Sequence, residues 1–164
     1  MSSHPASSQF RFEKRRVAAT VTLSSGQSLR GYLFTAAEST RYGGPERVGD
    51  VLNADSGFFP LEIEEDGGSR TVLCNRAHVV LVGLLDNEAE RDPGYSVATR
   101  RFVSVLLTTG QRVVGSVRVY QPAGHDRLSD WTRQPETFRY LETGDLTLLL
   151  NAAHIVDISE VPEL

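Results

Sequence analysis

Cysteine, lysine and long apolar runs are nearly absent from this chain of 164 residues. The single cysteine, Cys74, cannot form an internal disulfide, and its apolar neighbours in TVLCN predict a buried thiol. Lys14 is the only lysine among 17 basic residues. The chain has no run of eighteen apolar residues and no apolar segment of the kind that secretory signals carry near the N-terminus. We therefore expect no membrane span and a cytoplasmic location.

Recognisable catalytic motifs are missing as well. The chain has no nucleophile elbow, no phosphate-binding loop and no pair of carboxylates with an evident catalytic partner. A metal site would need three or four ligands close together, and no Cys or Glu recurs at a ligand spacing. The sequence therefore predicts a protein that is not an enzyme, with no catalytic residues, no bound metal and no cofactor.

Neither sign of charge accumulates along the chain, whose net charge is −4. Residues 15–85 and 100–164 each hold seven arginines against eight acids, and residues 86–99 hold one arginine against four acids. No segment has the basic excess that binding to a phosphate backbone usually needs. RNA is therefore a possible partner that the acidic charge disfavours, and we expect no membrane partner.

Three segments occur twice in the same order. They are LSSGQSLRG (23–31) with LTTGQRVVG (107–115), RVGD (47–50) with RLSD (127–130), and NRAHVVLV (75–82) with NAAHIVDI (151–158). Their spacings are 84, 80 and 76 residues, and the two changes fall in loops rich in Gly, Pro and Ser, which tolerate changes of length. This order predicts an internal duplication.

Each copy has the pattern of five short strands. Alternating apolar residues and β-branched residues indicate strands, and the first two are joined by a turn in which Gly26 or Gly110 supplies a positive φ. Gly31 and Gly115 fall inside the second strand, where glycine suits a sharp bend. We expect an all-β protein of two tandem five-stranded barrels packed with pseudo-two-fold symmetry. The expected boundaries are a mobile tail (1–14), a first barrel (15–85), an acidic linker (86–99) and a second barrel (100–164).

The two glycines with their flanking strands resemble the first motif of Sm-like proteins, whose fold is an SH3-like barrel. The residues concerned are Val21, Leu23, Gly26 and Gly31 in the first copy and Val105, Leu107, Gly110 and Gly115 in the second. The second motif of that family resembles Val72–Cys74, Asn75–His78 and Val79–Val82. The chain also resembles small uncharacterised bacterial domains of unknown function. The Sm-like resemblance implies RNA binding, although Asn53 lies several residues before the third strand, which the family's RNA-contacting asparagine directly precedes.

The repeated polar residues are candidates for structural turns and latches. These candidates are Arg47, Asp50, Asn75, His78, Arg127, Asp130, Asn151 and His154. Asn accepts a hydrogen bond from the backbone two residues on and so closes a turn, His can tie a neighbouring carbonyl, and an Arg and an Asp three apart can pair on one turn. We favour this reading over a paired metal or catalytic site, and over a ligand loop at RVGD and RLSD.

A second group of residues is a candidate interaction surface, namely Arg30, Arg76, Arg112, Trp131 and Arg139. Aromatic side chains beside a long loop can stack on bases, although more often they seal a small core.

Three functions remain as hypotheses at this point. The first is a non-enzymatic protein-interaction or self-assembly module, because small barrels leave strand edges open for pairing. The alternative is an RNA-binding Sm-like regulator that uses Arg47, Arg127 and the four arginines of the candidate interaction surface. A remote alternative is a PilZ-like sensor of cyclic dinucleotides, since RFEKR at 11–15 matches the first half of that motif while the second half has no match.

Overall fold

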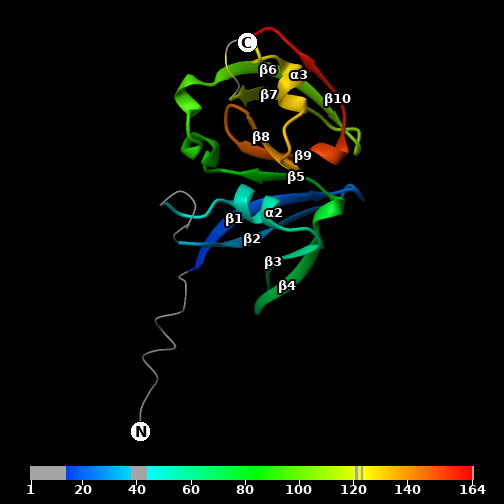
Figure 1. Cartoon of the computed structure of the whole chain (residues 1–164). Coiled ribbons are helices and arrows are strands. Elements are labelled where there is room, and N and C mark those ends of the chain that lie inside the picture. Colours follow the sequence, from blue (N-terminus) through cyan, green and yellow to red (C-terminus); the bar gives the residue numbers. More distant parts are fainter. Residues whose placement is uncertain (1–13, 38–43, 121, 123, 164) are drawn as a thin grey trace.

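The computed structural model describes residues 14–37, 44–120, 122 and 124–163. The expected mobile tail and Arg11 of RFEKR thus lie outside the described residues, apart from Lys14. The prediction of an all-β protein is confirmed (Figure 1). The strands are β1 (Lys14–Leu23), β2 (Ser28–Ala36), β3 (Phe58–Glu65), β4 (Gly68–Asn75), β5 (Val79–Leu84), β6 (Thr99–Leu107), β7 (Arg112–Val119), β8 (Phe138–Glu142), β9 (Thr147–Asn151) and β10 (Ile155–Glu160). The helices are α2 (Val48–Ala54) and α3 (Leu128–Thr132), with 3-10 turns η1 (Arg76–His78), η2 (Glu88–Arg91), η3 (Tyr95–Val97) and η4 (Ala152–His154).

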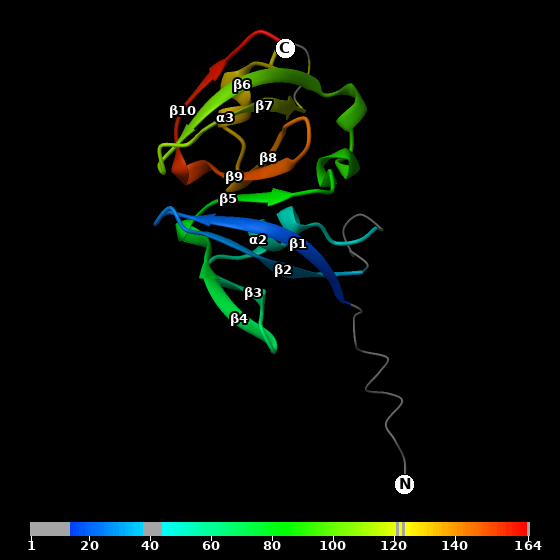
Figure 2. The same ribbon diagram turned by 180° about the vertical axis from the view of Figure 1, so that it is seen from behind.

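All ten strands join one antiparallel sheet in the order β10-β6-β7-β8-β9-β5-β1-β2-β3-β4. The first half of the chain (14–84) contains β1 to β5 with α2 and η1, and the second half (99–160) repeats this order with β6 to β10, α3 and η4. Each half curls around its own core (Figures 1 and 2). Among the described strands, however, pairing runs from β10 to β4 as one open sheet, and it closes neither half into a separate barrel.

Strand register recurs between the halves as well. In the first half Val21 lies opposite Val82, and Thr22 lies opposite Leu81 before the register shifts at Leu23. The corresponding strands β6 and β10 pair with the same register and shift at the corresponding point. The pairing of β3 with β4 is likewise repeated by β8 with β9. The two halves are therefore alike in pairing as well as in element order.

Glycine is required at four positions for two different reasons. Gly26 and Gly110 lie in the turn of the first hairpin of each half. Their φ values are 88° and 87°, which confirms the expected positive φ. Gly31 and Gly115 have no positive φ, but a Cβ atom there would lie 2.5 Å from the Glu62 carbonyl oxygen and 2.4 Å from the Glu142 carbonyl oxygen. Strand β2 pairs with β3 only at Tyr32 and Glu62, next to Gly31. Since Gly31 has no side chain, the hairpin β1–β2 can approach the hairpin β3–β4 closely at this point.

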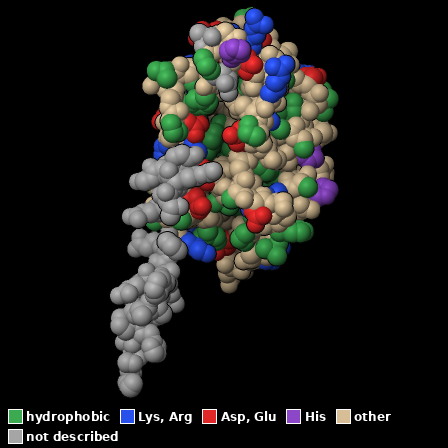
Figure 3. Space-filling view, in the orientation of Figure 1, with side chains coloured by type: hydrophobic (Ala, Val, Ile, Leu, Met, Phe, Trp, Pro, Cys, Tyr) green, Lys and Arg blue, Asp and Glu red, His purple; other side chains and the backbone are tan. Residues whose placement is uncertain are grey.

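Two apolar clusters fill the molecule. The first contains Val21, Leu33 and Leu61 of the first half, and it also contains Cys74, which is buried as expected. Burial raises the pKa of the Cys74 thiol, so the reactive thiolate form is disfavoured. The second cluster contains Val105 of the second half. On the outside, acidic and basic side chains are interspersed over the face seen in Figure 3, in line with the lack of charge segregation along the sequence.

Candidate functional site

The two halves are joined by their sheet edges. Strand β5 of the first half pairs with β9 of the second, and Val82 lies opposite Leu149 and Leu81 opposite Leu150. Leu149 packs in the first apolar cluster although it belongs to the second half, and Leu81 packs in the second cluster although it belongs to the first. The halves therefore share their cores across this junction and form one packed unit.

The junction overturns the expected pseudo-two-fold symmetry. A two-fold axis would bring the same strand of each half together, whereas here the fifth strand of the first half meets the fourth strand of the second. The contact is heterologous, and it leaves one strand of each kind, β4 and β10, at the two ends of the sheet. Each of these strands has one end beside the junction, where His154 before β10 contacts Ala77 after β4, and from there the two strands diverge toward opposite ends of the molecule (Figures 1 and 2).

Asn53 at the end of α2 clamps the first half to the second. Its side-chain amide donates a hydrogen bond of 2.9 Å to the Phe138 carbonyl, and the Phe138 N–H donates one of 2.8 Å to Asn53 Oδ1. Phe138 itself is buried in the first apolar cluster. Asn53 therefore satisfies both the N–H and the carbonyl group of Phe138, the first residue of β8.

The repeated Asn-x-Ala-His segments form turns, and the second copy also crosses the junction. Asn75 Oδ1 accepts from the Ala77 N–H, and Asn151 Oδ1 accepts from the Ala153 N–H, both at 3.0 Å. The amide of Asn151 further donates to the carbonyl of Val79, at 2.8 Å.

The histidines of these segments bond to hydroxyl groups. Nδ1 of His78 lies 2.9 Å from Ser24 Oγ, and Nδ1 of His154 lies 2.8 Å from Thr108 Oγ1. His154 Nε2 also lies 2.7 Å from the Ala77 carbonyl oxygen, so this histidine reaches the first half of the chain.

The two Arg-x-x-Asp segments begin the short helices. The carboxylate of Asp50 accepts from the backbone N–H of Arg47, and that of Asp130 accepts from the backbone N–H of Arg127, both at 2.9 Å. The Arg47 guanidinium also pairs with Asp50 at 3.2 Å and contacts Asp92. The first segment thus links the start of α2 to Asp92 in the acidic segment, whereas the second closes its own turn.

The acidic segment 86–99 is folded against both halves. Glu88 is buried, and its carboxylate accepts hydrogen bonds from the N–H groups of Val48 and Gly49 at 2.7 and 3.2 Å. Tyr140 of β8 donates its hydroxyl proton to the same carboxylate at 3.0 Å. Burial raises the pKa of Glu88, because the charged form loses hydration that these bonds restore only in part.

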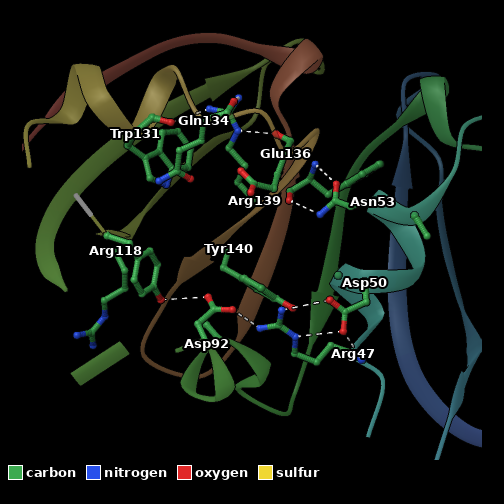
Figure 4. A pocket seen from close by; sticks show the side chains of 15 residues that line it. Arg47, Asp50, Asn53, Asp92, Arg118, Trp131, Gln134, Glu136, Arg139 and Tyr140 are labelled. Atoms are coloured by element: carbon green, nitrogen blue, oxygen red, sulfur yellow. Dashed lines mark hydrogen bonds and ion pairs between the residues drawn. The ribbon is translucent and has the colours of Figure 1, made fainter. Parts of the chain in front are cut away.

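A cavity of about 210 Å³ lies beside these contacts, between α2, η2, β8 and α3 (Figure 4). Two of its charged groups are bonded to each other, because Asp92 contacts Arg47, and Asp92 also accepts the Tyr120 hydroxyl proton at 3.0 Å. Tyr140 also lines it, and burial raises the pKa of that phenol.

The candidate interaction residues are found in different settings. Trp131 is buried, and the Arg139 guanidinium beside it donates to the backbone carbonyls of residues 131, 132, 134 and 136 (Figure 4). Burial lowers the pKa of Arg139. Arg76 donates to the backbone carbonyls of Val51, Ser56 and Phe58. Arg30 and Arg112 are exposed. The Arg112 guanidinium donates to Ser104 Oγ at 3.0 Å and pairs with Asp157 at 3.5 Å. The structure thus gives four of these five residues contacts inside the chain.

The described residues show neither a metal-binding cluster nor a membrane-spanning helix, and the comparisons with known proteins gave no match. In the described part of the chain, no three His, Cys, Asp or Glu side chains are placed to hold a metal ion. No helix among the described residues is long and apolar enough to cross a membrane. Neither protein-family models, curated proteins nor solved structures gave a match to this chain.

The junction was missed at the sequence level, although the sequence carries a signal for it. Strand β5 is apolar on both faces (VVLVGL), as are the three central residues of β9 (TLLLN). Strand β10 instead contains polar residues (IVDISE). A strand that is apolar on both faces is typical of burial on both faces. The roles of Asn53 and Glu88 have no comparable signal, because the partner of Asn53 lies 85 residues away and those of Glu88 lie 39 to 52 residues away.

Proposed function

We propose that the chain is a non-enzymatic assembly module, made by internal duplication, that binds protein through the open edges of its sheet. One observation carries this proposal: the chain already joins its own halves by edge pairing of β5 with β9 and sharing of apolar cores. The same kind of edge is open at β4 and β10, where the order of described strands ends.

Apolar side chains at these edges support the proposal. Leu73 on β4 is 64% exposed, Val156 on β10 is 59% exposed, and Phe58 on the neighbouring β3 is 61% exposed. An open strand edge offers unpaired N–H and C=O groups to an added strand, and apolar side chains beside it add binding energy.

Affinity capture from extracts of the source cells tests this function. The wild-type chain is compared with Leu73→Lys, which places a charge on the β4 edge, and with Val97→Lys, which alters an 86% exposed residue of η3. We expect Leu73→Lys to lose at least tenfold of the bound protein and Val97→Lys to retain it. Hydrogen exchange should then show slower exchange of β4 amides in the complex. Equal capture by all three proteins, counting copies of the chain itself, contradicts the proposal.

A further inference from the structure

Resting on this proposed function, we infer that the partner is a second copy of the chain, whose β10 pairs with β4 as β5 pairs with β9 inside one chain. With a spacing of 76 residues, β4 corresponds to β9 and β5 corresponds to β10. One free edge of each kind is therefore present on every copy. Because the two strands diverge from the junction toward opposite ends of the molecule (Figures 1 and 2), one copy cannot pair its own edges.

The apolar residues that the internal junction buries have exposed counterparts at the β4 edge. Phe138 is 2% exposed and Leu149 is 0% exposed, since both pack into the first apolar cluster across the junction. Their counterparts are Phe58 and Leu73, which are 61% and 64% exposed. Both pairs occupy the same register, because Phe138 lies opposite Asn151 and Phe58 lies opposite Asn75. The β4 edge therefore presents the same two apolar residues that β8 and β9 bury at the junction, but here no other described part of the chain buries them.

The β10 edge carries the other side of the junction in a more polar form. Val80 is completely buried in the second cluster, and its counterpart Val156 is 59% exposed. Asp157 and Glu160 stand where β5 has leucines. Within one copy these two acids pair with Arg112 at 3.5 Å and Arg101 at 3.3 Å, and Arg70 of β4 pairs with Glu65 at 2.6 Å. The two edges therefore bring no unpaired charge to each other, and the apolar residues carry the contact. Carboxylates also keep an open edge hydrated, which makes this pairing weaker than the internal one and reversible.

Polar groups of the repeated turn fit the same arrangement. Asn151 and His154 of the second half donate across the junction to the carbonyls of Val79, the first residue of β5, and of Ala77 in η1. Their counterparts, Asn75 and His78, use one side-chain atom each within the chain. In the part of the chain that the structure describes, no acceptor is bonded to the Asn75 amide nitrogen or to His78 Nε2. Backbone carbonyls of residues 152–155 in the second copy would occupy the corresponding positions.

The internal junction also fixes the register expected between copies. The opposed pairs are Asp157 with Cys74, Ile158 with Leu73, Ser159 with Val72, and Glu160 with Thr71. Since the contact joins two different edges, it repeats from copy to copy and gives a closed ring or an open filament.

Disulfide trapping tests the register. Opposed residues of antiparallel strands have Cα atoms about 4.5–5.5 Å apart, which suits a disulfide. The native Cys74 is buried, so the test uses a Cys74→Ala background with Thr71→Cys and Glu160→Cys, whose positions are exposed and opposed in this register. The two introduced thiols of neighbouring copies should crosslink with oxidised glutathione. We expect a ladder of linked multimers and a linked peptide that contains both positions. In the control, Thr71→Cys is combined with Asp157→Cys in the same background, which places the second thiol about 10 Å away along the strand and should give no ladder. Either Thr71→Cys or Glu160→Cys alone in that background should give dimers at most.

Light scattering on the purified wild-type chain provides an independent readout. We expect a mass of several copies, constant for a ring and rising with concentration for a filament, and Leu73→Lys should reduce it to one copy while Val97→Lys does not. A wild-type monomer at all concentrations, without a ladder for the chain that carries Thr71→Cys and Glu160→Cys, overturns self-pairing. If a different protein is then captured in a Leu73-dependent way, the proposed function stands and only the identity of the partner is wrong. If capture is also independent of Leu73, both proposals fail.

Discussion

Replacement of Asn53 by alanine should weaken the junction between the halves by a predictable amount. The substitution removes two hydrogen bonds, of 2.9 and 2.8 Å, to the backbone of Phe138. Loss of a partner for a buried backbone group costs about 1–3 kcal/mol. Asn53 is exposed, so water can replace part of each bond, and we expect a total of about 2 kcal/mol. For a chain of this size that corresponds to a fall of about 4–8 °C in Tm.

The assay is urea unfolding followed by circular dichroism, with calorimetry for Tm. Arg133→Ala is the matched control, because Arg133 occupies the corresponding position after α3 and its side chain is 77% exposed, with an ion pair of 3.8 Å to Asp130. Exposed pairs contribute about 0–1 kcal/mol, so this variant should unfold close to the wild type.

The outcome that refutes this reasoning is a free energy of unfolding for Asn53→Ala within 0.5 kcal/mol, roughly the range of neutral surface changes, of the wild-type value. The same applies if Asn53→Ala and Arg133→Ala are equally destabilised. Either result would mean that the clamp on Phe138 contributes nothing to the junction.

Further predictions concern the strand glycines and the buried acid. In urea unfolding, Gly31→Ala should lower the free energy of unfolding by about 3 kcal/mol or more, because its Cβ would lie 2.5 Å from a backbone oxygen. The control is Gly83→Ala, whose Cβ would have its nearest neighbour 3.6 Å away. This variant should stay within about 1 kcal/mol of the wild type. Similar losses for both would show that close approach is not the reason for Gly31. Glu88→Gln should cost about 1–3 kcal/mol, because the amide cannot accept all three hydrogen bonds, and Glu90→Gln on the exposed face of η2 should change little. Folding raises the pKa of Glu88, so the folded state keeps a proton that the unfolded state releases above about pH 4.5. The contribution of this group to stability is therefore full below about pH 4.5 and declines as the pH rises through the pKa of the folded state. The difference between wild type and Glu88→Gln should therefore be larger at pH 4.5 than at pH 8, and an equal or reversed difference in chemical unfolding would contradict the assigned cause.

Local features of the chain were predictable from residue type and spacing. An alternating apolar pattern predicts a strand wherever it occurs, and Gly26 and Gly110 take a positive φ because only glycine does so without a steric cost. Burial of Cys74 followed from its apolar neighbours for the same reason. These properties depend on residues within a few positions of one another, and the sequence determines them by itself.

How the two halves meet was decided only by the tertiary structure. The repeated segments are compatible with a two-fold contact and with the heterologous pairing of β5 with β9, because equivalent sequence specifies equivalent strands but not which edges join. The choice rests on contacts between distant residues, such as Asn53 with Phe138 and Glu88 with Tyr140. Such contacts become favourable only when both partners are already placed, since each alone would leave a polar group in a poorly hydrated site. The sequence determined the strands and turns of each half, and only the tertiary structure decided which strand edges join the two halves.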